Sequence, residues 1–171
     1  MTASILVGFS SVYGSTQEVA ADMAETLRKE GLEVDLQPAR NVRSLDGYQA
    51  IVLGAPLYMF HWHKDALRFL SKHRKALEDL PVVIFALGPF HNKEEELESA
   101  RNQLDKELAK YPWLKPVDIE VFVGKFDPDV LRFPYNMMGP LKQMPASDER
   151  DWEAIRAWAS SLPAKLALQP A

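Results

Sequence analysis

Short apolar segments alternate with longer amphipathic segments along the whole chain. The apolar segments span residues 5–9, 34–36, 50–54, 82–87 and 117–123. Between them, apolar residues recur every three to four positions over residues 15–30, 64–78, 93–110 and 149–162. That spacing is typical of one buried face of a helix. Strands that alternate with helices form a mostly parallel sheet with helices on both faces, so the pattern predicts an α/β fold.

The composition of the five predicted strands indicates their order in the sheet. The first, third and fourth are apolar throughout, as strands covered on both faces are. The second and fifth alternate with acidic residues, as in Val34-Asp35-Leu36, and therefore suit the edges. Edges at strands two and five fit a doubly wound, five-stranded parallel sheet of order 2-1-3-4-5.

Composition narrows the class of protein. The chain has 171 residues, a net charge of −4 and no cysteine. Its length predicts a single domain over residues 1–171, and the lack of cysteine excludes disulfides, thiolate metal sites and thiol nucleophiles. The mild acidity argues against a nucleic-acid partner. Because no leader pattern precedes the first apolar segment and no apolar run reaches the ~20 residues of a transmembrane segment, we expect a cytoplasmic protein.

Residues 124–148, here called the insertion, break the regular pattern. They contain four prolines together with many large apolar residues. Long irregular connections inside a compact domain are usually functional or disordered, and this one is too apolar for a solvated linker. The sequence leaves open whether it shapes a substrate pocket, touches a membrane surface or covers the sheet edge.

Hydroxyl side chains crowd the connection between the first strand and the first helix. We call this segment, Ser10-Ser11-Val12-Tyr13-Gly14-Ser15-Thr16, the hydroxyl loop. A helix N-terminus has unpaired N–H groups and binds anions, and Gly14 lets a ligand approach the backbone. Since the G-K-[ST] and G-x-G-x-x-G patterns are absent, a terminal monophosphate is the expected ligand. The alternative is a helix cap, because Ser15 and Glu18 satisfy the S-x-x-E capping box.

Aromatic residues follow the third and fourth predicted strands, at the same end of the sheet as the hydroxyl loop. The two segments are Gly54-Ala55-Pro56-Leu57-Tyr58-Met59-Phe60-His61-Trp62-His63 and Gly88-Pro89-Phe90-His91-Asn92. A flat heteroaromatic ring could stack there, with ~1–3 kcal/mol per aromatic contact. Packing beneath a loop or at a dimer contact is the alternative. His61 and His63 offer two metal ligands, but no third ligand is evident, so no metal is expected.

These three loops resemble those of the flavodoxin family. The hydroxyl loop resembles its flavin mononucleotide (FMN) phosphate loop, which implies phosphate contacts from Ser10, Ser11, Gly14, Ser15 and Thr16. The other two loops resemble its ring-binding loops, which implies ring contacts from Tyr58, Trp62, Phe90 and His91 and backbone donors from Ala55 and Gly88. The resemblance completes the FMN-binding set with Tyr13, Pro56, Leu57 and Pro89. The expected function is electron transfer to a redox partner protein or a small redox substrate.

A narrower resemblance covers nearly the whole chain. The stretch 58–63, the segment 124–144 and Asp151-Trp152-Glu153 look like the menaquinone-dependent protoporphyrinogen oxidase branch of flavodoxin-like proteins. This resemblance implies the alternative of an FMN-dependent oxidoreductase that acts on a tetrapyrrole or a quinone, with peripheral membrane contact. The insertion here is shorter and less basic than the one expected for that branch.

Two other functions fit the sequence poorly. A phosphorylation receiver shares the predicted strand order, and Lys125 follows the fifth strand as a receiver requires. However, no acidic pair follows the first strand, and the third strand ends in Ala55-Pro56 without an aspartate. A serine hydrolase is disfavoured because the G-x-S-x-G pattern is absent.

Overall fold

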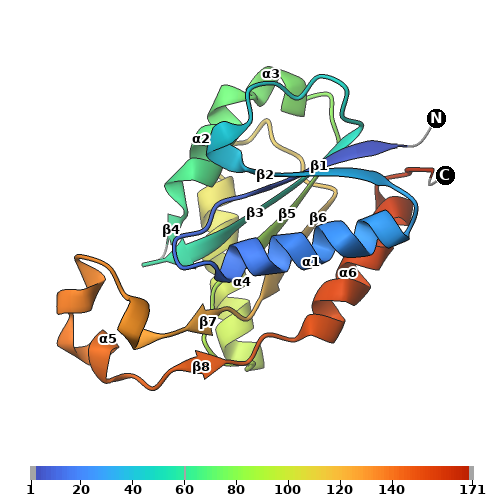
Figure 1. The fold of residues 1–171 in the computed structure, drawn as a ribbon. Helices are drawn as coiled ribbons and strands as arrows, with labels where there is room; N and C mark the ends of the chain where they lie inside the picture. The colour runs from blue at the N-terminus through green and yellow to red at the C-terminus, as the bar shows by residue number, and fades with distance from the viewer. Residues whose placement is uncertain (1–2, 60, 170–171) are drawn as a thin grey trace.

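The computed structural model describes residues 3–59 and 61–169. Five strands form a parallel sheet in the order β2-β1-β3-β5-β6 (Figure 1). They are β1 (Ser4–Phe9), β2 (Glu33–Pro38), β3 (Ala50–Tyr58), β5 (Val82–Leu87) and β6 (Asp118–Phe122). This order confirms the predicted doubly wound arrangement. The strands that are apolar throughout, β1, β3 and β5, lie in the interior, because only an interior strand buries both faces.

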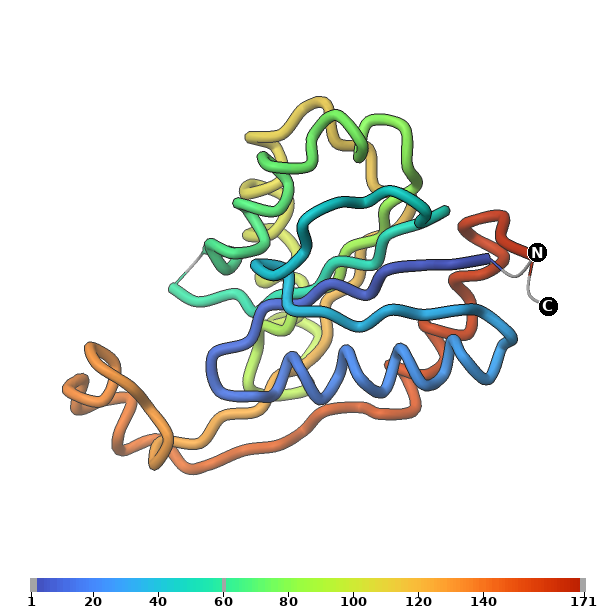
Figure 2. The backbone as a smooth tube through the Cα atoms, turned by 45° about the horizontal axis from the view of Figure 1, so that its top comes forward, coloured from blue at the N-terminus to red at the C-terminus, as the bar shows by residue number. Residues whose placement is uncertain are grey.

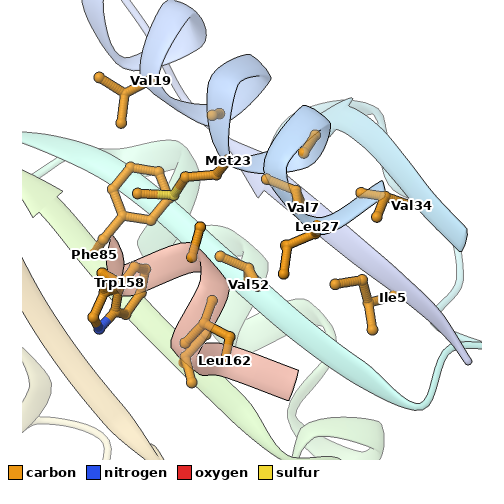
Figure 3. Packing of buried hydrophobic residues seen from close by; sticks show 14 of the residues in the cluster. Ile5, Val7, Val19, Met23, Leu27, Val34, Val52, Phe85, Trp158 and Leu162 are labelled. Atoms are coloured by element: carbon orange, nitrogen blue, oxygen red, sulfur yellow. The ribbon is translucent and has the colours of Figure 1, made fainter. Parts of the chain in front are cut away.

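Helices cover the two faces of the sheet and divide the core into two layers. The helices α1 (Ser15–Lys29) and α6 (Trp152–Lys165) pack on one face, where Met23 and Leu27 meet the strands (Figure 3). The helices α2 (Lys64–Lys72), α3 (Arg74–Leu77) and α4 (Glu94–Leu108) cover the opposite face. A short 3₁₀ helix, η1 (Ala39–Asn41), follows β2.

Two elements differ from the sequence-based expectation. The predicted helix over residues 64–78 is divided at His73, which ends α2 and precedes α3. His73 is buried and its ring packs 4.7 Å from that of Phe69, and this packing accompanies the break. In addition, a short strand β4 (His61–Trp62) folds back antiparallel onto the end of β3. Met59 adopts the left-handed φ of 47° in the turn before β4.

The insertion projects from the carboxyl end of the sheet. Two short antiparallel strands, β7 (Lys125–Phe126) and β8 (Ser147–Asp148), form its base. Its outer part contains η2 (Pro128–Val130), η3 (Tyr135–Met137) and α5 (Gly139–Gln143). Figure 2 shows this part standing away from the sheet, at the end opposite to the two chain termini. No helix within the described ranges is long and apolar enough to span a membrane.

Candidate functional site

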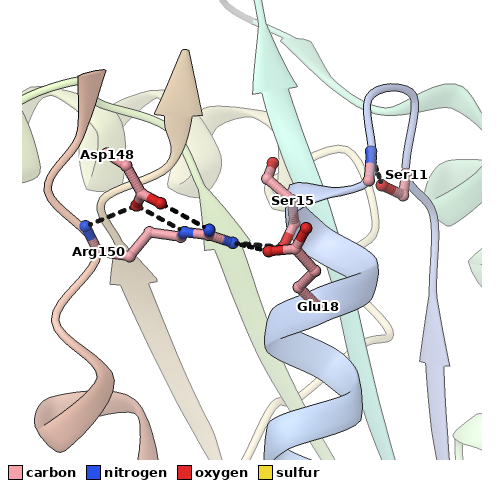
Figure 4. Close-up of polar contacts among 6 residues, drawn as sticks. Ser11, Ser15, Glu18, Asp148 and Arg150 are labelled. Carbon is pink, nitrogen blue, oxygen red and sulfur yellow. Dashed lines mark hydrogen bonds and ion pairs between the residues drawn. The ribbon is translucent and has the colours of Figure 1, made fainter. Parts of the chain in front are cut away.

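The hydroxyl loop is a tight connection whose shape depends on Gly14. β1 ends at Phe9 and α1 begins at Ser15, with Gly14 as the N-cap residue at a φ of 92°. The Oγ atom of Ser11 accepts a hydrogen bond of 3.0 Å from the N–H of Gly14 (Figure 4). The backbone N–H of Ser10 donates to the carbonyl of Gly54 at 3.0 Å. The loop is therefore fixed to the end of β1 and to the middle of β3.

The side chain of Ser10 is an orphaned polar group. The residue is 5% exposed, and its Oγ atom has no hydrogen-bond partner. Leaving a buried polar group unpaired costs about 1–3 kcal/mol, so such groups in folded proteins call for an explanation. A ligand with acceptor oxygens at this loop would supply the missing partner.

The capping-box interpretation of this segment is wrong. Gly14, not Ser15, is the N-cap residue, and the structure shows no side-chain hydrogen bond that caps α1. Ser15 is already inside the helix, because α1 begins at this residue directly after the left-handed Gly14. The Glu18 carboxylate is occupied elsewhere, since it accepts a hydrogen bond of 2.8 Å from Arg150. The first turn of α1 is left without a side-chain cap, as an anion-binding helix terminus requires.

A cavity of about 550 Å³ lies beside the hydroxyl loop, between the carboxyl end of the sheet, α4 and the insertion. Most of its surface is apolar. It is lined by Tyr13, Ser15, Leu57, Tyr58, Met59, Gly88, Pro89, Phe90, Glu95, Glu96, Ser99, Ala100, Gln103, Lys125, Phe126, Asp127, Val130, Leu131, Tyr135 and Leu141. A mostly apolar pocket with a few polar groups is the usual form of a small-molecule site.

Three tyrosines from separate segments meet at this cavity. The Tyr58 ring centroid lies 6.1 Å from that of Tyr13, edge to face, and 6.4 Å from that of Tyr135. Burial raises the pKa of Tyr58 far above its ordinary value, and the neighbouring tyrosines add to this effect. Tyr58 therefore stays a neutral phenol that presents an aromatic surface.

The loop after β5 joins the cavity from the other side. A Cβ on Gly88 would lie 3.1 Å from that of Ala100 on α4, so the close approach of these two segments favours glycine. The Pro89 carbonyl accepts a hydrogen bond of 2.9 Å from the N–H of Gly124 at the start of the insertion. The ring of Phe90 packs 4.7 Å from that of Phe126. This loop is therefore held by α4 and by the insertion together.

Several predicted site residues do not line the cavity. Trp62 is 1% exposed and packs in the core beneath α4, where its Nε1–H donates a hydrogen bond of 3.0 Å to the Ala55 carbonyl.

The other predicted residues outside the cavity lining have different surroundings. Pro56 lies within β3, and its carbonyl accepts a hydrogen bond from the backbone N–H of His63. His91 faces Glu96, with 3.1 Å between Nδ1 and the carboxylate. Ser10, Ser11, Gly14 and Thr16 form the adjacent hydroxyl loop, and Phe60 lies outside the described residues.

His61 and His63 point to different partners. The Nδ1 atom of His61 lies 3.2 Å from the Glu107 carboxylate on α4. The Nδ1 atom of His63 accepts a hydrogen bond from the N–H of Asp65 and caps α2. Burial lowers the pKa of His63 and so favours the neutral ring that this acceptor role needs. Both histidines therefore have structural contacts that account for them.

Sequence reasoning missed two residues at the site. Tyr135 comes from within the insertion, where the sequence alone indicates only one more large apolar residue. Arg150 follows β8, yet its side chain reaches Glu18 and the Ser15 carbonyl on α1 (Figure 4). These contacts join positions more than 130 residues apart in sequence. No local pattern could have revealed them.

The fold and the site together define a doubly wound α/β domain whose insertion covers a cavity at the carboxyl end of the sheet. Residues 6–151 match the family model described as a flavodoxin domain, so the chain belongs to that family.

The comparisons with individual proteins support the same fold. The chain is 24% identical over 131 residues to protoporphyrinogen IX dehydrogenase (quinone) of Escherichia coli K12, covering 75% of this chain and 70% of the relative. A Streptococcus pneumoniae flavodoxin superposes with a TM-score of 0.58 and 20% identity over 95% of this chain and 99% of its own. Oxidised flavodoxin 2 of Bacillus cereus gives a TM-score of 0.59 at 17% identity, over 96% and 98% of the two chains.

Proposed function

We propose that the protein binds FMN and functions in electron transfer. The observation that carries this proposal is the buried Ser10 hydroxyl, which has no partner within a loop whose helix terminus has no side-chain cap. FMN binding is a general property of the family to which the chain belongs. The largely apolar cavity beside the loop supplies room for the flat ring.

The hydroxyl loop has the donors that a terminal phosphate needs. Ser10, Ser11, Ser15 and Thr16 offer hydroxyls, and the first N–H groups of α1 offer the backbone donors. The loop contains no lysine or arginine, so hydrogen bonds would carry the binding. Hydrogen bonds to charged groups contribute about 1.5–3 kcal/mol each.

The ring would lie among the aromatic and backbone groups at the carboxyl end of the sheet. Tyr13, Tyr58 and Phe90 line the cavity there, and Gly88 and Pro89 bring backbone close to it. When bound, the flavin accepts and donates the electrons, while the chain binds it, orients it and controls access to it.

The Ser10→Ala variant tests the phosphate assignment. Because Ser10 Oγ has no protein partner, its removal should leave the free energy of unfolding of the apo protein unchanged or slightly higher. FMN affinity should fall by about 10- to 100-fold, the loss of one hydrogen bond to a charged group. Riboflavin, which has no phosphate, serves as the control ligand, and its affinity should not change. Equal FMN affinity in the wild type and the variant would refute the assignment.

A second candidate function is an FMN-dependent oxidoreductase that transfers electrons between a tetrapyrrole and a quinone. The favouring observation is that the insertion supplies about a third of the residues that line the cavity, from Lys125 to Leu141. A simple carrier needs no such cover, whereas an enzyme uses it to hold a flat apolar substrate. The Escherichia coli relative has a name that describes this reaction.

The oxidoreductase is tested by adding protoporphyrinogen IX and a menaquinone analogue to the FMN-loaded protein. Porphyrin fluorescence should rise while the quinone is reduced, and Leu131→Asp, which places a charge in the cavity lining, should slow this rise. If the loaded wild-type protein transfers electrons to a carrier but never oxidises the porphyrinogen, the oxidoreductase is refuted and only the electron-carrier function is left.

The outer part of the insertion would give such an enzyme peripheral access to a membrane-borne quinone. Phe133 and Met137 are each 76% exposed. Residues 130–147 include Arg132 and Lys142 but no acidic residue, although the whole chain has a net charge of −4. Exposed apolar side chains with neighbouring cations suit an anionic lipid surface. We propose a cytoplasmic location for the protein, as the sequence leads us to expect.

A further inference from the structure

The insertion and Arg150, which follows it, both contact the segment that forms the hydroxyl loop and the first turn of α1. After β8, Arg150 donates to Asp148 through Nε and Nη2, at 2.8 Å each, and to Glu18 through Nη1 at 2.8 Å. Nη1 also lies 3.5 Å from the Ser15 carbonyl oxygen. Before η3, the backbone N–H of Arg132 donates to the hydroxyl of Tyr13 at 3.3 Å.

The insertion has little core of its own to hold it in place. From residue 127 to residue 148 no residue is buried. The packing of Phe126 secures only its base. The position of the outer part over the cavity must therefore depend on a few directed contacts, since local stability follows buried apolar contact.

Arg150 is the most enclosed of these contacts. Its side chain is only 4% exposed, although it is charged, and its guanidinium lies 4.8 Å from the centre of the Trp152 ring. The planar guanidinium can bond two carboxylates in fixed directions while it stacks on an aromatic ring, which a lysine ammonium cannot do. The Asp148 and Glu18 carboxylates raise the pKa of Arg150, although burial opposes this. Arg150 thus joins β8 to α1 as a permanent cation.

We propose that Arg150 is a positioning residue that couples the hydroxyl loop to the insertion, so that phosphate binding at the loop orders the insertion over the cavity. The coupling is reciprocal. If phosphate binding favours the ordered insertion, an insertion that is already ordered must strengthen phosphate binding by the same factor. The identity of the phosphate ligand as FMN rests on the proposed function. The contact between Arg150 and Asp148 of the insertion is independent of the proposed function.

Hydrogen exchange of residues 126–147, followed by mass spectrometry, tests the tie in the apo protein. Arg150→Ala should raise exchange in this segment by at least about tenfold, because a group of charged hydrogen bonds is lost, while exchange in β3 and β5 stays unchanged. Arg156→Ala is the matched control. Arg156, on α6, also pairs with an acid of α1, Asp22, at 3.0 Å. Because this pair does not involve β8, its loss should have no effect on the insertion. Glu18→Gln removes one partner only and should give an intermediate increase.

Added ligands test the coupling. FMN should slow exchange of residues 126–147 in the wild type, and riboflavin should slow it less because it has no phosphate. In Arg150→Ala, FMN should lose this effect and bind about tenfold more weakly, while riboflavin affinity stays the same. Arg150→Lys should restore little of either effect.

Exchange in Arg150→Ala and Glu18→Gln that equals the wild type would overturn the proposal, whether or not FMN binds. Exchange that rises in the apo variant while FMN still orders the insertion would also overturn the coupling. If FMN fails to bind the wild type, the proposed function fails, and the apo comparison still decides the role of Arg150.

Discussion

The sheet and the insertion are held in place by different kinds of interaction. In the sheet, Ile5, Val52 and Ile84 are completely buried. In the insertion, Phe133 and Met137 are the most exposed large apolar side chains of the described residues. The sheet is therefore stabilised mainly by apolar burial, while the insertion is placed by single hydrogen bonds, ion pairs and aromatic contacts. Changes in the sheet should alter stability, and changes in the insertion should alter the site and leave stability intact.

A pair of glycine substitutions should show the largest contrast. A Cβ on Gly54 of β3 would fall 1.9 Å from an atom of the buried Phe85 ring, whereas a Cβ on Gly139 of α5 meets nothing within 4 Å. Overpacking a core typically costs about 1–3 kcal/mol, and Gly54→Ala should reach the upper end of that range. Gly139→Ala should change stability by less than about 0.5 kcal/mol. Urea denaturation measures both, and equal effects would contradict the comparison.

A smaller loss of stability is expected for Trp62→Phe. This change removes the Nε1–H that donates to the Ala55 carbonyl, and a lost hydrogen bond costs about 0.5–1.5 kcal/mol. Because Trp62 packs in the core and not in the cavity lining, flavin absorption bands of the loaded protein should not shift. Tyr58→Leu is the comparison variant, and its flavin bands should shift. A band shift in Trp62→Phe alone would place the tryptophan against the ring.

The fold was predictable where the determinants are local. Uninterrupted apolar segments marked β1, β3 and β5, and the acidic alternation marked the edges. The hydroxyl loop was predictable because a strand, a glycine and a helix start follow one another directly. The division at His73 was not predictable, because it depends on a ring that packs against Phe69 inside the fold.

The parts of the site that depend on distant contacts could not be predicted. The side of β3 on which Trp62 lies is set by the turn into β4, for which the sequence has no glycine signal. Whether Glu18 caps α1 or pairs with Arg150 depends on where β8 brings the chain back. The strands β7 and β8 are only two residues long each and show no periodicity.

Acid should weaken the tie between the insertion and α1. The hydrogen bond from Arg150 lowers the pKa of Asp148, although burial opposes this. The contact is therefore fully present above about pH 4, the ordinary range of an aspartate, and is lost as the pH falls through the lower pKa of the folded state. Pepsin cleavage within residues 128–144 should accelerate below pH 4 in the wild type, measured relative to a free peptide of the same sequence.

The Asp148→Asn variant is the control for this pH dependence. It cannot ionise, so its cleavage should already be fast at pH 5 and should rise little on acidification. Circular dichroism at each pH confirms that the sheet stays folded. If the wild type is cleaved at the same rate as the variant at every pH, the Asp148–Arg150 contact does not hold the insertion in place.

The smallest change in stability is expected at the outer part of the insertion. Phe133→Ser and Met137→Ser together remove two exposed apolar side chains, so the free energy of unfolding should change by less than about 0.5 kcal/mol. Sedimentation with anionic phosphatidylglycerol vesicles should nevertheless be lost, while neutral phosphatidylcholine vesicles bind neither protein. Vesicle binding that survives the double substitution would assign the membrane contact to another surface.

The visible absorption spectrum of the purified protein, before and after addition of excess FMN, tests the central claim most directly. The proposed FMN site predicts shifted flavin bands and quenched flavin fluorescence at an equimolar ratio, because a phosphate held at the hydroxyl loop would keep the ring in the cavity. A spectrum that equals the sum of free protein and free FMN would contradict the account. It would leave the α/β fold in place and the Ser10 hydroxyl without a ligand.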